Sequence, residues 1–170
     1  MLIVQLIILA ILLYIIFLLC YSMIKGAPYA AISSNRIETM LELLQPAKGK
    51  KLVDLGSGDG RITIEAAKKG VISYGYEINP LIYLLSIYNI KKKKARKANI
   101  VLGDYWNVDL SKFDYVTVWG TQFMMRRLEE KLMKELRPGS KVVSNHFTFP
   151  NWKAKTKKND VYLYVSKYKT

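Results

Sequence analysis

The stretch that decides the fold is VDLGSGDGRI, residues 53–62, in which three glycines alternate with other residues between an apolar segment and a helical pattern. Residues 52–55 predict a short buried strand, and residues 61–69 predict the helix that follows it. The glycines of the intervening turn are Gly56, Gly58 and Gly60. Glycine permits positive φ and a close approach of the backbone to a ligand. The turn therefore predicts a ligand site rather than a plain loop.

The spacing of the glycines separates the ligand classes that use such a turn. A dinucleotide site, G-x-G-x-x-G/A, would place its third small residue at Arg61, whose bulk would block a pyrophosphate. A P-loop needs Gly-Lys-Ser/Thr, which this turn lacks. The pattern Asp54-x-Gly56-x-Gly58-x-Gly60 instead resembles motif I of the seven-strand class of S-adenosylmethionine-dependent methyltransferases. That cofactor has no phosphate, and a carboxylate such as Asp54 can help to hold its ammonium group.

An acidic residue ends the next predicted strand. Residues 71–76 predict this strand, and Glu77 follows it, 21 residues after Gly56. In a doubly wound unit, an acid at this distance accepts hydrogen bonds from the ribose hydroxyls of a bound nucleoside. The spacing alone does not separate S-adenosylmethionine from NAD.

A second acid follows the third predicted strand, residues 99–102. Asp104 can accept a hydrogen bond from an adenine amino group, while Tyr105 or Trp106 stacks near the ring. A surface turn would also use Gly-Asp. The position after the third strand favours the cofactor site, as in the methyltransferase pattern.

The remaining segments complete an α/β pattern. Residues 113–119 predict a fourth strand that leaves Trp119 at the carboxyl edge of the sheet, where α/β proteins bind ligands. Residues 141–146 predict a fifth strand, and period-two alternation around Asn159-Asp160 predicts a closing hairpin. The expected fold class is α/β: a doubly wound, Rossmann-like sheet of seven strands whose last pair is an antiparallel hairpin.

The N-terminal residues 1–24 contain no charged side chain and are almost entirely apolar. As a helix they would reach about 36 Å, enough for a hydrocarbon core of roughly 30 Å. A signal peptide is disfavoured because there is no basic leading segment. We expect one transmembrane helix with the basic remainder of the chain on the cytoplasmic side. Residues 25–45 predict a linker and a pre-domain helix capped by Asn35, and residues 46–170 predict the cofactor-binding domain.

Charge and cysteine content narrow the class of partner. The chain has 170 residues, one cysteine and a net charge of +14, which indicates one modest domain without a disulfide framework and an anionic partner surface. Residues 91–97, KKKKARK, predict a solvated helix end that also contacts anionic lipid. Nucleic acid is disfavoured because no aromatic side chains interleave with this run. His146 is the sole histidine, so no metal site is predicted.

Several motifs together are similar to the family of small protein-lysine methyltransferases. That family includes archaeal broad-specificity enzymes and mitochondrial enzymes that modify the adenine nucleotide translocase and the ATP synthase c-subunit. The matching segments are PYAAISSNRIETML, VDLGSGDGRI, GYEINP, GDYW, YVTVW, LEEKLMKELRPGSKVVSNHF, and NW before VYLYV. The resemblance implies S-adenosylmethionine as cofactor and a lysine ε-amine as acceptor. Its cofactor positions correspond to Asp54, Gly56, Gly58, Glu77 and Asp104.

The acceptor side of the site is less well defined by the sequence. Tyr29 matches the aromatic residue of the family's pre-domain loop, although Ala31 and Ile32 replace the usual second proline and hydroxyl residue. Tyr29, Trp119 and Phe147 are candidates for an aromatic channel that accepts a lysine and excludes water. No general base is identified, and the substrate is expected to be a protein in or near a membrane.

Other functions remain open from the sequence. A lipid or small-molecule methyltransferase is the first alternative, and an RNA methyltransferase is the second. An enzyme that forms 5-methylcytosine needs a nucleophilic cysteine, and the sole one, Cys20, lies in the apolar N-terminal segment. A non-catalytic protein that senses the cofactor is a further option.

Overall fold

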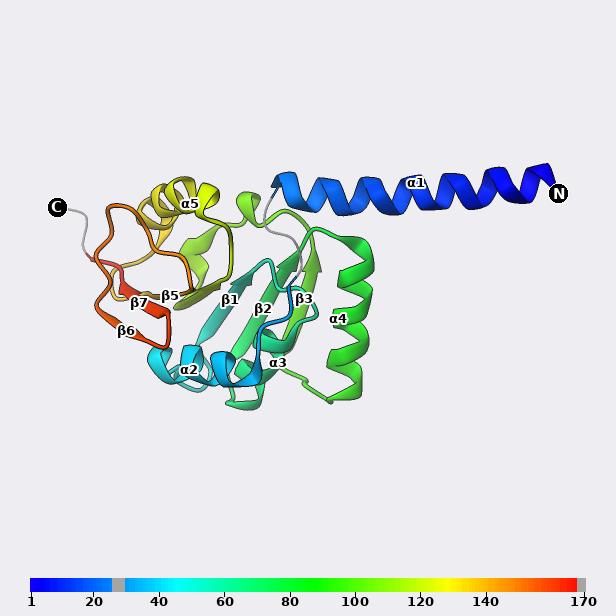
Figure 1. The fold of residues 1–170 in the computed structure, drawn as a ribbon. Coiled ribbons are helices and arrows are strands. Elements are labelled where there is room, and N and C mark those ends of the chain that lie inside the picture. The colour runs from blue at the N-terminus through cyan, green and yellow to red at the C-terminus, as the bar shows by residue number, and fades with distance from the viewer. Residues whose placement is uncertain (26–29, 168–170) are drawn as a thin grey trace.

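A seven-stranded sheet with the strand order β3-β2-β1-β4-β5-β7-β6 organises the described part of the chain (Figure 1). The computed structural model describes residues 1–25 and 30–167, without the side chains of residues 19, 20 and 22–25. The strands are β1 (Lys51–Leu55), β2 (Ile72–Glu77), β3 (Ala98–Leu102), β4 (Tyr115–Val118), β5 (Lys141–Asn145), β6 (Thr156–Lys158) and β7 (Val161–Val165). The α-helices are α1 (Leu2–Lys25), α2 (Ser34–Leu44), α3 (Arg61–Lys68), α4 (Pro80–Lys92) and α5 (Gln122–Glu135). Two short 3-10 helices are η1 (Tyr105–Asn107) and η2 (Leu110–Lys112).

The pairing of the strands confirms the predicted seven-strand, Rossmann-like sheet. Strands β1 to β5 are mutually parallel, whereas β7 is antiparallel to both β5 and β6. The strand order reverses between β1 and β4, because the chain runs outward from β1 to β3 and then crosses to β4 and β5. In such sheets, ligands bind outside the carboxyl ends of the strands at this reversal.

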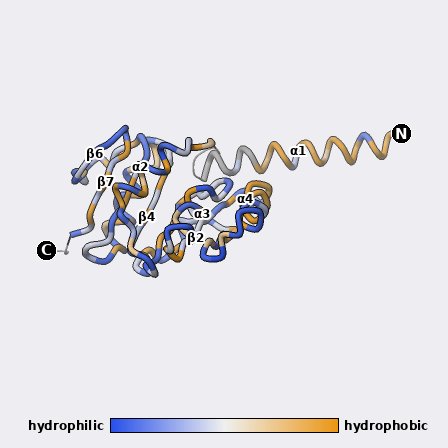
Figure 2. The backbone as a smooth tube through the Cα atoms, turned by 90° about the horizontal axis from the view of Figure 1, so that it is seen from below, coloured by the Kyte–Doolittle hydropathy of each residue, from blue (hydrophilic) through white to orange (hydrophobic). Residues whose placement is uncertain are grey.

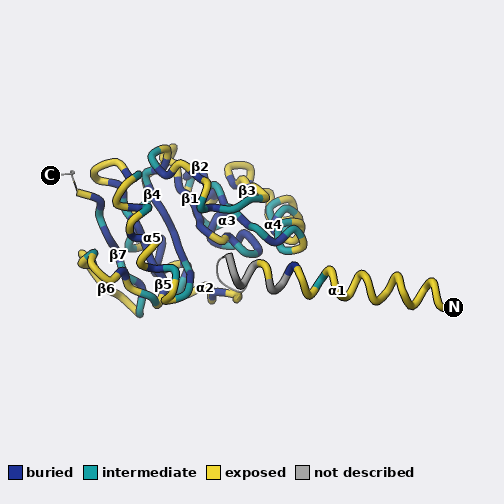
Figure 3. Tube along the Cα trace, turned by 90° about the horizontal axis from the view of Figure 1, so that it is seen from above, coloured by how far each residue is buried: buried dark blue, intermediate teal, exposed yellow. Residues whose placement is uncertain are grey.

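Helices cover both faces of the sheet and bury two apolar cores (Figure 3). On one face, α5 packs through Met125, Leu128 and Leu132, which are completely buried, against residues of β1 and β4. On the other face, α2 and α3 pack against the sheet. Alternate residues of one strand point to opposite cores: in β1, Val53 belongs to the first and Leu52 to the second. The sheet is therefore buried on both sides, which fixes the positions of its strand ends.

One element boundary differs from the sequence prediction, whereas the closing hairpin turns where the sequence predicts it. Helix α2 begins two residues earlier than expected, so that Ser33 and not Asn35 occupies the N-cap, without a side-chain capping bond. The Asn35 carbonyl instead accepts a hydrogen bond from the Thr39 hydroxyl at 3.0 Å. The closing hairpin turns at Asn159 and Asp160, whose φ values of 49° and 55° suit a two-residue hairpin turn.

Most of the described side chains of helix α1 are apolar and exposed (Figures 2 and 3). Within the described residues, no helix is long and apolar enough to cross a membrane. A span needs about 20 consecutive apolar residues. The predicted transmembrane helix over residues 1–24 is therefore wrong. For the same reason, the predictions of a single-pass protein and of a domain on the cytoplasmic side are wrong. A lipid partner bound through that anchor is not supported.

Candidate functional site

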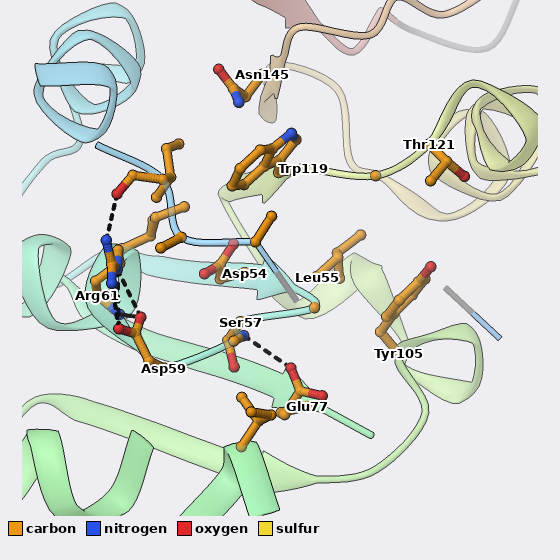
Figure 4. A pocket seen from close by; sticks show the side chains of 18 of the residues that line it. Asp54, Leu55, Ser57, Asp59, Arg61, Glu77, Tyr105, Trp119, Thr121 and Asn145 are labelled. Carbon is orange, nitrogen blue, oxygen red and sulfur yellow. Dashed lines mark hydrogen bonds and ion pairs between the residues drawn. The ribbon is translucent and has the colours of Figure 1, made fainter. Parts of the chain in front are cut away.

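A cavity of about 800 Å³ opens at the carboxyl ends of the parallel strands, where the strand order reverses (Figure 4). The glycine turn after β1 forms its floor, and the segment 30–33 before α2 lines another side. Of the residues predicted for the site, those that line the cavity are Asp54, Gly56, Gly58, Glu77, Asp104, Tyr105, Trp119 and Phe147. Gly60 lies behind the turn as the N-cap of α3. Tyr29, the remaining candidate, falls outside the described residues.

The glycine turn has the backbone that its sequence predicts. Gly56, Gly58 and Gly60 have φ values of 81°, 55° and 80°, in the region that only glycine adopts readily. The turn also packs closely on the neighbouring strand: a Cβ atom at Gly75 of β2 would lie 2.5 Å from the Ser57 Cβ. Gly75 is thus a site residue that sequence analysis missed. Its signal was a glycine inside a strand, which often marks a close approach of two backbones.

Asp54, the last but one residue of β1, presents an unpaired oxygen in a buried position. Its Oδ1 accepts a hydrogen bond from the Thr117 hydroxyl of β4 at 2.7 Å. Its Oδ2 is buried and has no hydrogen-bond partner among the described residues. Burial, together with the nearby carboxylates Glu77 and Asp59, raises the pKa of Asp54 from 3.8 to about 7, although the hydrogen bond from Thr117 opposes the rise. A cation of the ligand beside Oδ2 would stabilise the ionised carboxylate and so offset the free-energy cost of its burial. The position therefore fits an ammonium group.

Glu77, at the end of β2, is held by the backbone through both carboxylate oxygens. The Gly58 N–H donates to Oε2 at 2.9 Å, and the Asn79 N–H donates to Oε1 at 2.8 Å. Burial raises the pKa of Glu77, although the two N–H groups oppose that rise. Because each carboxylate oxygen has a second lone pair, Glu77 can still accept from two hydroxyls of a ligand.

Asp104 and Tyr105 follow β3 at the far side of Glu77. Asp104 Oδ1 accepts a hydrogen bond from the Trp106 N–H at 2.9 Å and so caps η1. Tyr105 lines the cavity and is 7% exposed, and burial raises its pKa, which keeps its hydroxyl protonated. The Trp106 ring is covered by the Arg127 guanidinium at 4.1 Å from the ring centroid. Of these two aromatic side chains, Tyr105 is the one that lines the cavity.

The ends of β4 and β5 supply the other side of the cavity. Trp119 and Phe147 both line it, together with Asn145 and His146. His146 has a φ of 70°, and its N–H donates to the Asp160 carbonyl at 2.7 Å, which anchors this turn to the closing hairpin. In the described part of the chain, no group of three or more His, Cys, Asp or Glu residues could hold a metal ion.

Two arginines reach the cavity that the sequence did not single out. Arg61 pairs with Asp59 through Nε–Oδ1 at 2.8 Å and Nη2–Oδ2 at 2.6 Å. Arg36 of α2 donates from Nη1 to Asn145 Oδ1 at 3.1 Å. Arg36 and Asn145 are 109 residues apart, a separation at which no local sequence pattern can predict a contact.

The doubly wound sheet, the glycine turn after β1 and the acids at the carboxyl ends of β1, β2 and β3 define the Rossmann-like class of S-adenosylmethionine-dependent methyltransferases. The sequence profile of one family, the ANTKMT methyltransferase domain, matches residues 54–156. The chain belongs to that family.

Curated relatives are named as protein-lysine methyltransferases. The human lysine N-methyltransferase of the ATP synthase c-subunit is 38% identical over 126 residues, which cover 74% of this chain and 54% of that protein. The present chain thus spans about half the length of this relative. A protein-lysine N-methyltransferase from Saccharolobus islandicus is 34% identical over 155 residues, which cover 85% of this chain and 96% of that protein.

A solved structure supports the same class. The RNA methyltransferase from Salinibacter ruber, in complex with S-adenosyl-L-homocysteine, superposes with a TM-score of 0.79 at 28% identity. The superposition covers 83% of this chain and 96% of that one.

Proposed function

We propose that this protein transfers a methyl group from S-adenosylmethionine to the ε-amine of a lysine in a protein substrate. The observation that carries the proposal is the buried, unpaired Oδ2 of Asp54 in a cavity that also holds Glu77 and Asp104. The names of the relatives support lysine as the acceptor, above all the archaeal enzyme that this chain matches over nearly its full length.

The cofactor would lie across the ends of β1, β2 and β3. Asp54 Oδ2 would accept a hydrogen bond from the ammonium group, and Glu77 would accept from the ribose hydroxyls. Asp104 would accept from the adenine amino group, with Tyr105 against the ring. The glycine turn, Gly56 to Gly60, allows the cofactor to lie against bare backbone because none of the three glycines has a side chain. When bound, the cofactor supplies an electrophilic methyl group on a sulfonium.

The other residues of the cavity would align the acceptor amine with the cofactor and remove water from it. Trp119 and Phe147 would form an aromatic channel that holds the lysine side chain and excludes water. The neutral lysine amine, Nζ, would take up the methyl group that the cofactor supplies, with S-adenosylhomocysteine as the leaving group, and the resulting ammonium would release a proton to water. Most of the acceleration would come from positioning the two reactants in line.

The catalytic unit would comprise residues 46–170 together with α2. Ile37, Met40 and Leu44 of α2 belong to the same apolar core as Leu52 of β1. We therefore expect that removal of α2 would open this core as well as the cavity beside it.

RNA methylation is the second candidate function. The Salinibacter ruber protein with the same fold is described as an RNA methyltransferase, and the net charge of +14 would suit a polyanionic substrate. The two candidates share the cofactor site and differ only in the acceptor.

The test is an acceptor assay with the full chain and S-adenosylmethionine labelled on the methyl group. A cell extract is separated after reaction into protein, RNA and lipid. We expect label in protein, recovered as methyl-lysine, and its loss with Asp54→Ala but not with Asp109→Ala, an exposed carboxylate outside the cavity. Label in RNA would support the second candidate, and label in lipid would contradict both.

A further inference from the structure

The segment 30–33 lines the cofactor cavity without belonging to any helix or strand. Its Ile32 side chain is 5% exposed and belongs to the apolar core beneath α2 and α3. A segment without regular structure must satisfy its backbone groups through side chains or water. The partners of this segment therefore decide how firmly it covers the cavity.

Arg61 connects this segment to the glycine turn (Figure 4). Its Nη1 donates to the Ile32 carbonyl at 2.5 Å, while Nε and Nη2 hold the Asp59 carboxylate. Asp59 is fixed in turn, because its carbonyl accepts from the Asn89 amide of α4 at 3.0 Å. One guanidinium thus joins the segment, the turn and, through Asp59, the helix that follows β2.

Arg36 ties the other end of the same stretch to the opposite half of the sheet. Its Nη1 donates to Asn145 Oδ1 at the end of β5 and, at 3.0 Å, to the Asn159 carbonyl of the closing hairpin. The stretch from Ile32 to Arg36 is therefore held on both sides of the point where the strand order reverses.

We propose that Arg61 and Arg36 are positioning residues that close residues 30–33 over the bound cofactor. The inference rests on the proposed function, since it assumes that the cavity holds S-adenosylmethionine. The closed segment retains the cofactor, so that both arginines act on cofactor affinity without touching the methyl group.

The experiment compares Arg61→Ala and Arg36→Ala with Arg96→Ala, an exposed arginine in the turn before β3. Calorimetry measures the Kd of S-adenosylhomocysteine, kinetics give KM for S-adenosylmethionine and kcat, and hydrogen exchange reports on the amides of residues 30–37. We expect Kd and KM to rise roughly tenfold in each of the first two variants, as for loss of a hydrogen bond to a charged group. We expect kcat at saturating cofactor to change less than threefold, exchange at residues 30–37 to quicken, and Arg96→Ala to match the wild type.

Arg61→Lys is the second variant, for use where Arg61→Ala does not fold. A lysine ammonium lacks the planar fork that reaches both Asp59 and the Ile32 carbonyl. We therefore expect Arg61→Lys to raise Kd nearly as much as alanine does while the melting temperature stays close to that of the wild type.

The outcomes separate the two proposals. If the wild type binds S-adenosylhomocysteine but Kd and exchange at residues 30–37 are unchanged in the folded arginine variants, the positioning role is overturned and the cofactor site stands. A fall in kcat with an unchanged KM would also overturn it, since it would place the arginines at the chemical step. If the wild type does not bind S-adenosylhomocysteine, the proposed function itself fails.

Discussion

The buried carboxylate of Asp54 makes the free energy of unfolding depend on pH, because its pKa is higher in the folded chain than in the unfolded chain. Burial raises its pKa from 3.8 to about 7 in the folded chain, so the folded state holds a proton that the unfolded state has released between these values. The free energy of unfolding therefore falls as the pH rises from about 4 to 7 and is flat above. Three pKa units correspond to at most about 4 kcal/mol.

Asp54→Asn removes this titration while preserving the shape of the side chain. Its amide leaves a buried N–H group without an acceptor, which costs about 1–3 kcal/mol at every pH. The stability of the variant relative to the wild type should nevertheless grow by about 2–3 kcal/mol between pH 5 and pH 7, because only the wild type must ionise Asp54. The same variant should bind S-adenosylhomocysteine much more weakly, since an amide oxygen replaces the carboxylate that faces the ammonium group.

Urea unfolding of both proteins without cofactor, at several pH values from 5 to 8, measures the difference directly. The matched control is Asp109→Asn, an exposed carboxylate outside the cavity. A stability difference between Asp54→Asn and the wild type that does not change with pH would refute the assignment of a raised pKa to Asp54.

Three further substitutions test other parts of the site. Glu77→Gln should raise the Kd of S-adenosylhomocysteine by roughly ten- to a hundredfold, because it exchanges a charged acceptor for a neutral one. Calorimetry measures this Kd, with Glu130→Gln, at an exposed residue of α5, as the control. Gly75→Ala should lower the free energy of unfolding by about 1–3 kcal/mol, because its Cβ would lie 2.5 Å from the Ser57 Cβ. The control is Gly103→Ala, whose added Cβ meets nothing within 4 Å. Equal denaturation midpoints for the two variants would contradict the contact. Trp119→Ala should raise KM for a lysine substrate about three- to thirtyfold at unchanged cofactor affinity, and Trp119→Phe should have a KM close to that of the wild type. Steady-state kinetics with both substrates varied measure this, and a change in KM for S-adenosylmethionine instead would contradict it.

The parts of the site that the sequence could predict are those built from local patterns. The glycine turn follows a predicted strand, and Asp54, Glu77 and Asp104 lie at or just after the carboxyl ends of predicted strands. Their meeting at one edge therefore follows from a parallel sheet alone. The choice between Tyr105 and Trp106 required the structure, because it depends on Arg127 covering the Trp106 ring.

The parts that the sequence could not predict depend on contacts between distant segments. Arg61 reaches Ile32 across 29 residues, and Gly75 matters only because Ser57 lies against it. Helix α1 shows a different limit: uncharged composition predicted a transmembrane span, a conclusion that the described residues do not support. Composition reports how apolar a segment is and leaves its surroundings open.

The most direct test of the central claim is a crystal structure of this chain with S-adenosylhomocysteine. We predict the ammonium group within hydrogen-bond distance of Asp54 Oδ2, the ribose hydroxyls at Glu77 and the adenine amino group at Asp104. A nucleoside bound elsewhere, or bound in this cavity with its adenine end at Asp54, would contradict the account.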